Sequence, residues 1–210
     1  MKVIVTGFDP FDTFDVNPSR EAVSRLPDFV KLNQNSEAVK VAKLELPTCC
    51  TDAFEKLCLE VEASADDDFA LVLSGLASSR DKICLEKFAL NERHYRGPDN
   101  NGHDWQDEII HEGGPDAIKS RLPLRSLVQF LNQNGFAADL SHHAGTFVCN
   151  ETYYRSLYRW QEKPNCRGIV FVHLPPYESY KHSDPSYVDE REPLQAYTDA
   201  LAAIAAFIGG

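Results

Sequence analysis

The chain has 210 residues, of which 43% are hydrophobic and 25% are charged, so it is long enough for one compact domain with a real core and too short to indicate two. Its formal net charge is −11 and it has no basic stripe, which argues against nucleic acid as a partner and disfavours anionic membrane surfaces. Its apolar stretches are far too short to span a bilayer, so no membrane segment is expected.

The first predicted element is a β-strand over residues 2–8. Its apolar part is too short for a signal peptide and no small-residue cleavage site follows it, so we expect a cytoplasmic protein. In that compartment the six cysteines are expected to be free thiols. Cys49 and Cys50 are adjacent and no CxxC pair exists, so a cysteine-based zinc site is not expected.

Short apolar runs then alternate with helical patterns along the chain. Strands are predicted at residues 2–8, 39–46, 69–74, 83–90, 138–141 and 168–173, and helices at 19–26, 51–65, 122–134, 150–160 and 193–207. The first and third strands are nearly all apolar, as is typical of strands that are buried on both faces. The alternation predicts one α/β domain over residues 1–210, with a mostly parallel sheet and helices on both sides.

The loops at the carboxyl ends of parallel strands are where such folds bind ligands. Four segments are expected at one edge of the sheet: residues 7–14, residues 75–80, the run that leads to Cys149, and His173 at the end of the last strand. Residues 91–121 lack periodicity and are rich in Gly, Asp, Asn and His, which predicts either a functional loop or a small hairpin.

Cys149 is the strongest candidate for chemistry. Small and polar residues precede it and a helical pattern follows at once, so its thiol is expected at a helix start, where unpaired N–H groups stabilise thiolate. His173 would be the base that nucleophilic acyl transfer needs. Each residue also has a simpler interpretation, because single cysteines and histidines are more often structural.

Glu86 allows two interpretations. On an alternating strand it would face solvent, which is the default. If it is buried, it needs a partner, and a histidine held by it would gain orientation and a stabilised imidazolium. Phe8, Phe11 and Phe14 would likewise either cap the core or line a flat apolar pocket. His94, His103, His111, His142 and His143 show no metal-ligand spacing and are interpreted as surface or pocket rim.

Four motifs in collinear order resemble pyroglutamyl peptidase I, a family of cysteine peptidases also called pyrrolidone carboxyl peptidases. They are Gly7-Phe8-Asp9-Pro10-Phe11 followed by Asn17-Pro18-Ser19, then Arg80 with Ile83, Glu86, Ala89 and Asn91, then Ala144 to Asn150, and finally Val172-His173-Leu174-Pro175. The resemblance covers most of the chain. It implies a three-layer α/β/α fold with a mixed sheet, similar to purine nucleoside phosphorylases.

The resemblance also implies roles for single residues. Cys149 would be the nucleophile, His173 the general base and Glu86 the residue that orients the histidine. The substrate would be a peptide with an N-terminal pyroglutamate. Its ring would lie between Phe8 and Phe11, with Leu76, Arg96 and Val148 also at the substrate site. No cofactor and no metal are implied, and members of the family are homotetramers or monomers.

The chain departs from the family pattern at residues 75–80. Leu76 stands where the family has a polar side chain, and Ser78 and Ser79 stand where it has glycines, which would strain the backbone if φ were positive there. A binder without activity, or an amidase of altered specificity, is therefore the alternative function. A nucleoside phosphorylase would rest on fold analogy alone.

Overall fold

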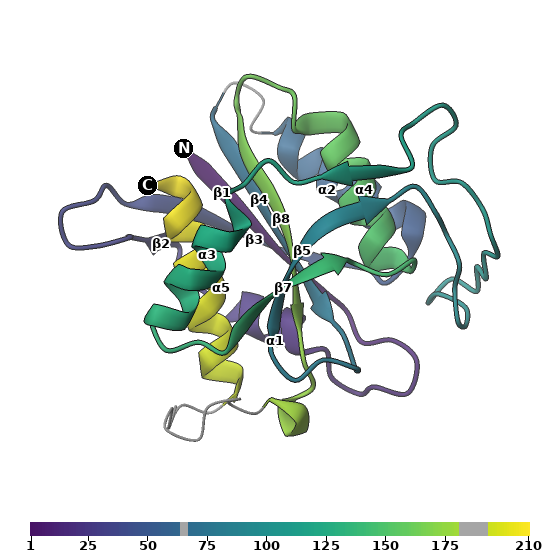
Figure 1. Ribbon diagram of the computed structural model, residues 1–210, viewed down its shortest axis with the longest axis horizontal. Coiled ribbons are helices and arrows are strands. Elements are labelled where there is room, and N and C mark those ends of the chain that lie inside the picture. The colour runs from purple at the N-terminus through teal and green to yellow at the C-terminus, as the bar shows by residue number, and fades with distance from the viewer. Residues whose placement is uncertain (64–66, 181–192) are drawn as a thin grey trace.

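Strands of one twisted sheet run through the centre of the molecule, with helices on both of its faces (Figure 1). The computed structural model describes residues 1–63, 67–180 and 193–210. The strands are β1 (Lys2–Phe8), β2 (Phe29–Val30), β3 (Val39–Leu46), β4 (Phe69–Leu76), β5 (Ile83–Leu90), β6 (Ala117–Lys119), β7 (Ala138–His143) and β8 (Cys166–Leu174). The helices are α1 (Pro18–Ser24), α2 (Cys50–Glu62), α3 (Leu124–Gln133), α4 (Val148–Trp160) and α5 (Pro193–Gly209), with a short 3-10 helix at Tyr177–Ser179.

The sheet is mixed. Its strand order is β2-β3-β1-β4-β8-β5-β6, with β7 paired to β5. Strands β3, β1, β4 and β8 are parallel, whereas β5 is antiparallel to β8 and β7 is parallel to β5. The strand that leads toward Cys149 therefore runs opposite to β8. Four segments were expected to follow parallel strands to one edge of the sheet. This is correct for the loops after β1 and β4 and for His173. It is wrong for the run that leads to Cys149, because β7, the strand before it, runs in the opposite direction.

Two apolar layers enclose the sheet, which gives the predicted three-layer α/β/α arrangement. Residues of β1 alternate between the layers, with Val3 and Val5 in one and Ile4 and Phe8 in the other. Helices α1, α3 and α5 cover the first layer, and α2 and α4 cover the second (Figure 1). Strand β4 is buried along its whole length. This position explains why its sequence is nearly all apolar rather than alternating.

Most of the predicted elements are confirmed with small changes at their ends. Helix α1 begins as expected, with the Asn17 side chain accepting a hydrogen bond from the N–H of Ser19 and a proline at the first helical position. Strands β2 and β6 were not predicted, because segments of two and three residues carry no periodicity. Within the described ranges, none of the helices combines the length and apolar character that crossing a bilayer requires.

Candidate active site

Cys149 is the second residue of α4, one residue past the helix start. Phe147 precedes the helix as its N-cap and has no polar side chain, so the N–H groups of the first turn point beyond the helix end without a capping side chain. The sulfur packs directly on β4. A Cβ atom added to Gly75 would lie 2.9 Å from Cys149 Sγ, so only glycine leaves room for the thiol here.

His173 lies beside Gly75, because the two residues are partners in the pairing of β4 with β8. Its Nδ1 is 2.7 Å from Glu86 Oε1, and a carboxylate can only accept, so Nδ1 carries the proton. Glu86 is 0% exposed and His173 is 6% exposed. The structure thus buries Glu86 against the histidine, and the default of a solvent-facing carboxylate is wrong. The thiol and the histidine thus both lie beside Gly75, and the carboxylate contacts the histidine.

The charge on Glu86 is only partly compensated. Glu86 Oε2 is buried and has no hydrogen-bond partner among the residues that the structure describes. Arg80 Nη2 is 3.9 Å from Oε1 and donates a hydrogen bond to Ser141 Oγ at 2.8 Å. An under-satisfied buried carboxylate is costly unless a cation compensates it. His173, at 2.7 Å, is therefore a closer partner of the Glu86 carboxylate than Arg80.

The thiol is partly accessible to solvent but lies deep among protein atoms. Burial, followed by the negative charge of Glu86, raises the pKa of Cys149 to about 12, while its own backbone N–H opposes the rise. The predicted stabilisation of thiolate by the helix start is therefore outweighed by loss of hydration. At neutral pH the resting group is a thiol, so an attack on substrate requires a base to take its proton.

The two aromatic residues expected around a substrate ring differ in exposure. Phe8 is 2% exposed and its ring contacts Phe171, with the ring centroids 6.4 Å apart. Phe11 is partly exposed and contacts Phe14 and Phe147 at 5.9 and 5.7 Å. Phe8 thus belongs to the core layer, and Phe11 is the ring that remains accessible. Phe147, which sequence reasoning missed, joins Phe11 to Tyr95.

The other candidates for substrate contact lie in different environments. Leu76 is buried as the last residue of β4, and Val148 is buried as the first residue of α4, whereas Arg96 is exposed in the loop after β5. Ser78 and Ser79 follow β4 in a tight turn in which Arg80 N donates to Ala77 O. Among the described non-glycine residues only Asp12 and Asp107 have positive φ. The two serines are therefore accommodated without strain.

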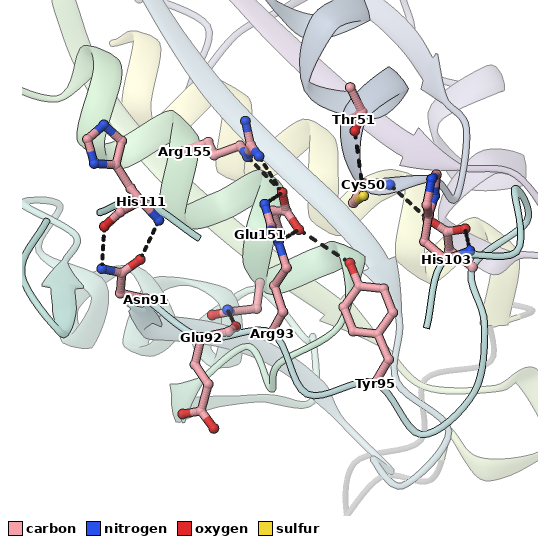
Figure 2. A network of polar contacts seen from close by, with 12 residues as sticks. Cys50, Thr51, Asn91, Glu92, Arg93, Tyr95, His103, His111, Glu151 and Arg155 are labelled. Carbon is pink, nitrogen blue, oxygen red and sulfur yellow. Dashed lines mark hydrogen bonds and ion pairs between the residues drawn. The ribbon is translucent and has the colours of Figure 1, made fainter. Parts of the chain in front are cut away.

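A network around Glu151 anchors the start of α4 (Figure 2). The Glu151 carboxylate is fully buried and accepts hydrogen bonds from Arg93 at 2.7 and 2.8 Å, from Arg155 Nε at 2.8 Å and from Tyr95 OH at 3.3 Å. Asn150 adds hydrogen bonds from its side chain to Leu90 O and Glu92 O. These contacts tie the loop after β5 to the helix that carries Cys149. Only the spacing of Glu151 and Arg155 gave a signal for the network in the sequence.

A second loop contact supports the segment that carries Phe11. Asp9 Oδ1 accepts from Thr48 N at 2.6 Å and from Asn100 Nδ2 at 3.2 Å, and Asn100 also donates to Pro10 O. Residues far apart in the sequence thus hold this loop. A hollow of about 430 Å³ lies elsewhere, between α2 and α4, and none of the candidate site residues lines it.

These features define a class of protein. A cysteine at a helix start, beside a histidine that a buried carboxylate orients, is the arrangement of enzymes that transfer acyl groups through a thioester. Carried on a three-layer α/β fold, it is the site of a cysteine hydrolase.

Comparison with known proteins narrows the class to one family. A family model described as pyroglutamyl peptidase matches residues 1–208. The pyrrolidone-carboxylate peptidase of Fusobacterium nucleatum is 37% identical over 174 residues, which are 83% of this chain and 78% of that protein. That of Enterococcus faecalis is 34% identical and covers 96% of this chain and 90% of its own length. The chain belongs to the pyroglutamyl peptidase family and is a cysteine peptidase.

Solved structures agree with this assignment. The crystal structure of pyroglutamyl peptidase I from Bacillus amyloliquefaciens is similar with a TM-score of 0.81 and 30% identity, covering 98% of this chain and 95% of that one. The pyrrolidone carboxyl peptidase from Thermus thermophilus has a TM-score of 0.77 and 30% identity, with coverage of 99% and 100%. Both sequence and fold thus extend the similarity over nearly the whole chain.

Proposed function

We propose that this chain hydrolyses the amide bond that follows an N-terminal pyroglutamyl residue of a peptide. Cys149 is the nucleophile, His173 the general base, and Glu86 the residue that orients the histidine. One observation carries the proposal: His173, whose Nδ1 is 2.7 Å from Glu86, pairs in the sheet with Gly75, on which the Cys149 sulfur packs. The pyrrolidone-carboxylate and pyroglutamyl peptidases that the chain resembles support the choice of substrate.

Proton transfer begins the reaction. The high pKa of the buried thiol means that His173 must accept the Cys149 proton through Nε2 as the sulfur attacks the substrate carbonyl. Glu86 keeps the proton on Nδ1 and stabilises the imidazolium. The backbone N–H groups at the start of α4 face the developing oxyanion, and the loss of one such donor typically costs about 3 kcal/mol of barrier.

The second half of the reaction reverses the proton transfer. His173 gives its proton to the leaving amine, and the peptide shortened by one residue departs. A thioester then links the pyroglutamyl carbonyl to Cys149. His173 next takes a proton from water, which attacks the thioester. The bond from the carbonyl carbon to sulfur breaks, free pyroglutamate is released, and the Cys149 sulfur takes the proton back from His173.

Recognition of the substrate relies on a flat, neutral lactam ring rather than on an ammonium group. Phe11 and Phe147 offer partly exposed aromatic faces beside the start of α4. Phe8 forms the deeper wall, and Leu76 and Val148 close the apolar side. The loop after β4 contributes backbone groups, and Arg96 reaches the site from the loop after β5.

The chain also carries features that bear on its location and assembly. All six cysteines are free. Free thiols fit a reducing compartment, which supports the cytoplasm as the location. A homotetramer or a monomer is the proposed assembly, and sedimentation of the purified chain distinguishes them. The alternative of an inactive ligand binder has no support, because thiol, imidazole and carboxylate are all present and adjacent.

The test is release of a chromophore from a pyroglutamyl amide, compared with a prolyl amide that has the same leaving group. We expect turnover of the pyroglutamyl compound alone, inhibition by iodoacetamide, and no turnover by the Cys149→Ser variant. Cys58→Ser, which changes a thiol on α2 outside the site, is the matched control and should retain activity. Turnover by Cys149→Ser at the wild-type rate, or preference for the prolyl amide, would overturn the proposal.

A further inference from the structure

Three side chains of different chemistry meet outside the catalytic site. Cys49 Sγ, a carboxylate oxygen of Asp99 and a ring nitrogen of His103 all lie within 4.8 Å of one another. Cys49 is the N-cap residue of α2, whereas Asp99 and His103 belong to the loop after β5. Figure 2 shows this loop with His103 beside Cys50 and Thr51 at the start of α2. Cys49 and Asp99 are buried and His103 is exposed, so the cluster opens to solvent on one side.

The spacing of the two harder ligands fits one metal ion. His103 Nδ1 is 3.3 Å from Asp99 Oδ2. Nitrogen and oxygen ligands bind Zn²⁺ at about 2.0–2.1 Å, so two of them at the corners of a tetrahedron are about 3.4 Å apart. A Zn–S bond is longer, about 2.3 Å, and allows the thiolate to sit somewhat farther away. The cluster therefore needs only a small adjustment to surround an ion.

The surroundings hold the ligands in place. Asp99 Oδ1 accepts from Asn101 N at 3.0 Å and from His103 N at 2.9 Å, and Asp99 Oδ2 accepts from Cys50 N at 3.2 Å. Asn101 Nδ2 donates to Cys49 Sγ at 3.0 Å and to Asp52 Oδ2 at 3.1 Å. Such outer hydrogen bonds orient ligands before a metal arrives. Asp52 adds a further negative charge next to the cluster.

We propose that Cys49, Asp99 and His103 bind a divalent transition metal ion of the zinc class, with the fourth position open to solvent. A thiolate together with an imidazole favours Zn²⁺ or Co²⁺ over Mg²⁺ and Ca²⁺, which prefer oxygen ligands alone. On binding, the ion takes the place of the Cys49 thiol proton, which passes to solvent. Sequence spacing gave no sign of the site, because fifty positions separate Cys49 from Asp99 and no short motif spans them.

The site would act on the segment that carries Phe11. The loop that holds Asp99 and His103 also includes Asn100, whose side chain donates to Asp9 Oδ1 and Pro10 O. Thr48 N, next to Cys49, also donates to Asp9. A metal ion that joins the start of α2 to this loop would hold Thr48 and Asn100 in place. These two residues support the segment over residues 8–14. None of the ion's ligands belongs to the group Cys149, His173 and Glu86, so the ion would have a structural role.

The experiment uses the full chain with Cys149→Ser, because the catalytic thiol would itself bind metal. Equilibrium dialysis against Zn²⁺ should give one bound ion per chain, and Co²⁺ should give the near-ultraviolet charge-transfer band of a cysteine thiolate ligand. Adding Cys49→Ser or His103→Gln should weaken binding at least tenfold, and Cys49→Ser should remove the band. Saturating Zn²⁺ should raise Tm by about 5 °C in the parent and not in these variants.

The matched control is His94→Gln. His94 lies on the same loop and its Nδ1 is 2.8 Å from Asp107 Oδ1, so it forms a similar His–Asp pair that has no cysteine partner. It should bind Zn²⁺ as the parent does. The proposal is overturned if the parent binds no Zn²⁺, or if His103→Gln binds as tightly as the parent. It is equally overturned if His94→Gln loses the ion. His103 is exposed, so its substitution decides the question even if Cys49→Ser lowers stability.

Discussion

At the scale of single residues, the central feature of the site is that the Cys149 thiol retains its proton. A thiol whose pKa is raised to about 12 by burial is almost entirely protonated at neutral pH. In the proposed reaction the proton moves to His173 as substrate binds. His173 and Cys149 would then act as one unit, with Glu86 as the fixed anion that holds the imidazolium.

His173→Ala should lower kcat by about 10²–10⁴-fold, the usual contribution of a general base. It should also slow the alkylation of Cys149 by iodoacetamide, because the thiol loses the proposed acceptor of its proton. Mass spectrometry of time points gives both the rate at Cys149 and, as an internal control, the rate at Cys58. Unchanged labelling of Cys149 would show that the histidine does not activate the thiol.

Glu86→Gln should reduce kcat less than His173→Ala does. The amide oxygen keeps an acceptor for the His173 Nδ1–H, but the negative charge that stabilises the imidazolium is lost. We expect Tm to stay within a few degrees of wild type, because among the described residues Oε2 has no hydrogen-bond partner that the amide would lose. Steady-state kinetics and thermal melts of both variants check this. Full activity of both variants would show that His173 is not the base and that Glu86 does not orient it.

Phe11→Ala should raise KM for a pyroglutamyl amide about tenfold to a hundredfold, because a buried aromatic contact contributes about 1–3 kcal/mol. The variant Phe14→Ala is the control. Phe14 packs against Phe11 on the same loop, so its removal should affect KM only through the position of the Phe11 ring. KM is measured for both at one pH. If Phe11→Ala leaves KM unchanged, its ring does not contact the lactam.

At the scale of elements, the arrangement of β5 explains both a success and a failure of sequence reasoning. The bounds of β1, β3 and β5 follow directly from their apolar runs. The direction of β5 was missed, although residues 77–82 are too few for the crossover that joins two parallel strands. That short connection was the signal for an antiparallel strand. It also accounts for the reversed direction of β7, which pairs with β5.

Glu151→Ala should destabilise the chain by about 3 kcal/mol, because it leaves Arg93 and Arg155 without their shared carboxylate in a largely buried place. Tm should fall by about 6–12 °C for a chain of this size. Arg159→Ala, on the same helix as Glu151, is the matched control, since it breaks an exposed pair with Glu62 of α2 and should cost less than about 1 kcal/mol. Equal losses of Tm would mean that the network does not anchor α4.

At the scale of the whole molecule, buried thiols link stability to alkaline pH. Burial raises the pKa of Cys84 to about 11 and that of Cys149 to about 12, compared with about 8.5 in an unfolded chain. Below pH 8.5 both states hold these protons. As pH rises toward 11 the unfolded state loses them first, so the free energy of unfolding falls.

The variant Cys84→Ala isolates one of these groups. Between pH 8 and pH 10.5 its free energy of unfolding should fall by about 2 kcal/mol less than that of wild type. Urea unfolding at the two pH values measures the difference, and the pH 8 values correct for the small cavity. Equal declines would show that the Cys84 proton is not retained in the folded state.

From the sequence, only those site residues could be predicted that lie within a short motif. Cys149, His173 and Glu86 became candidates because each stands in a recognisable segment. The Cys49, Asp99 and His103 cluster and the Glu151 network were not, since their members come from separate segments that only the fold brings together. For Phe8 the sequence left open whether the ring caps the core or lines a pocket, and the structure places it in the core beside Phe171 on β8.

The packing of Cys149 against Gly75 has a consequence for how the chain acquires activity. Glu86 and His173 are 87 positions apart, and the sulfur reaches them only where β4 and β8 are paired in register. Contacts between such distant positions form late, after local helices. During refolding, helical signal should therefore return before the first turnover. Recovered activity would therefore report when the central sheet has formed. A chain with one mispaired strand would be helical and compact but inactive.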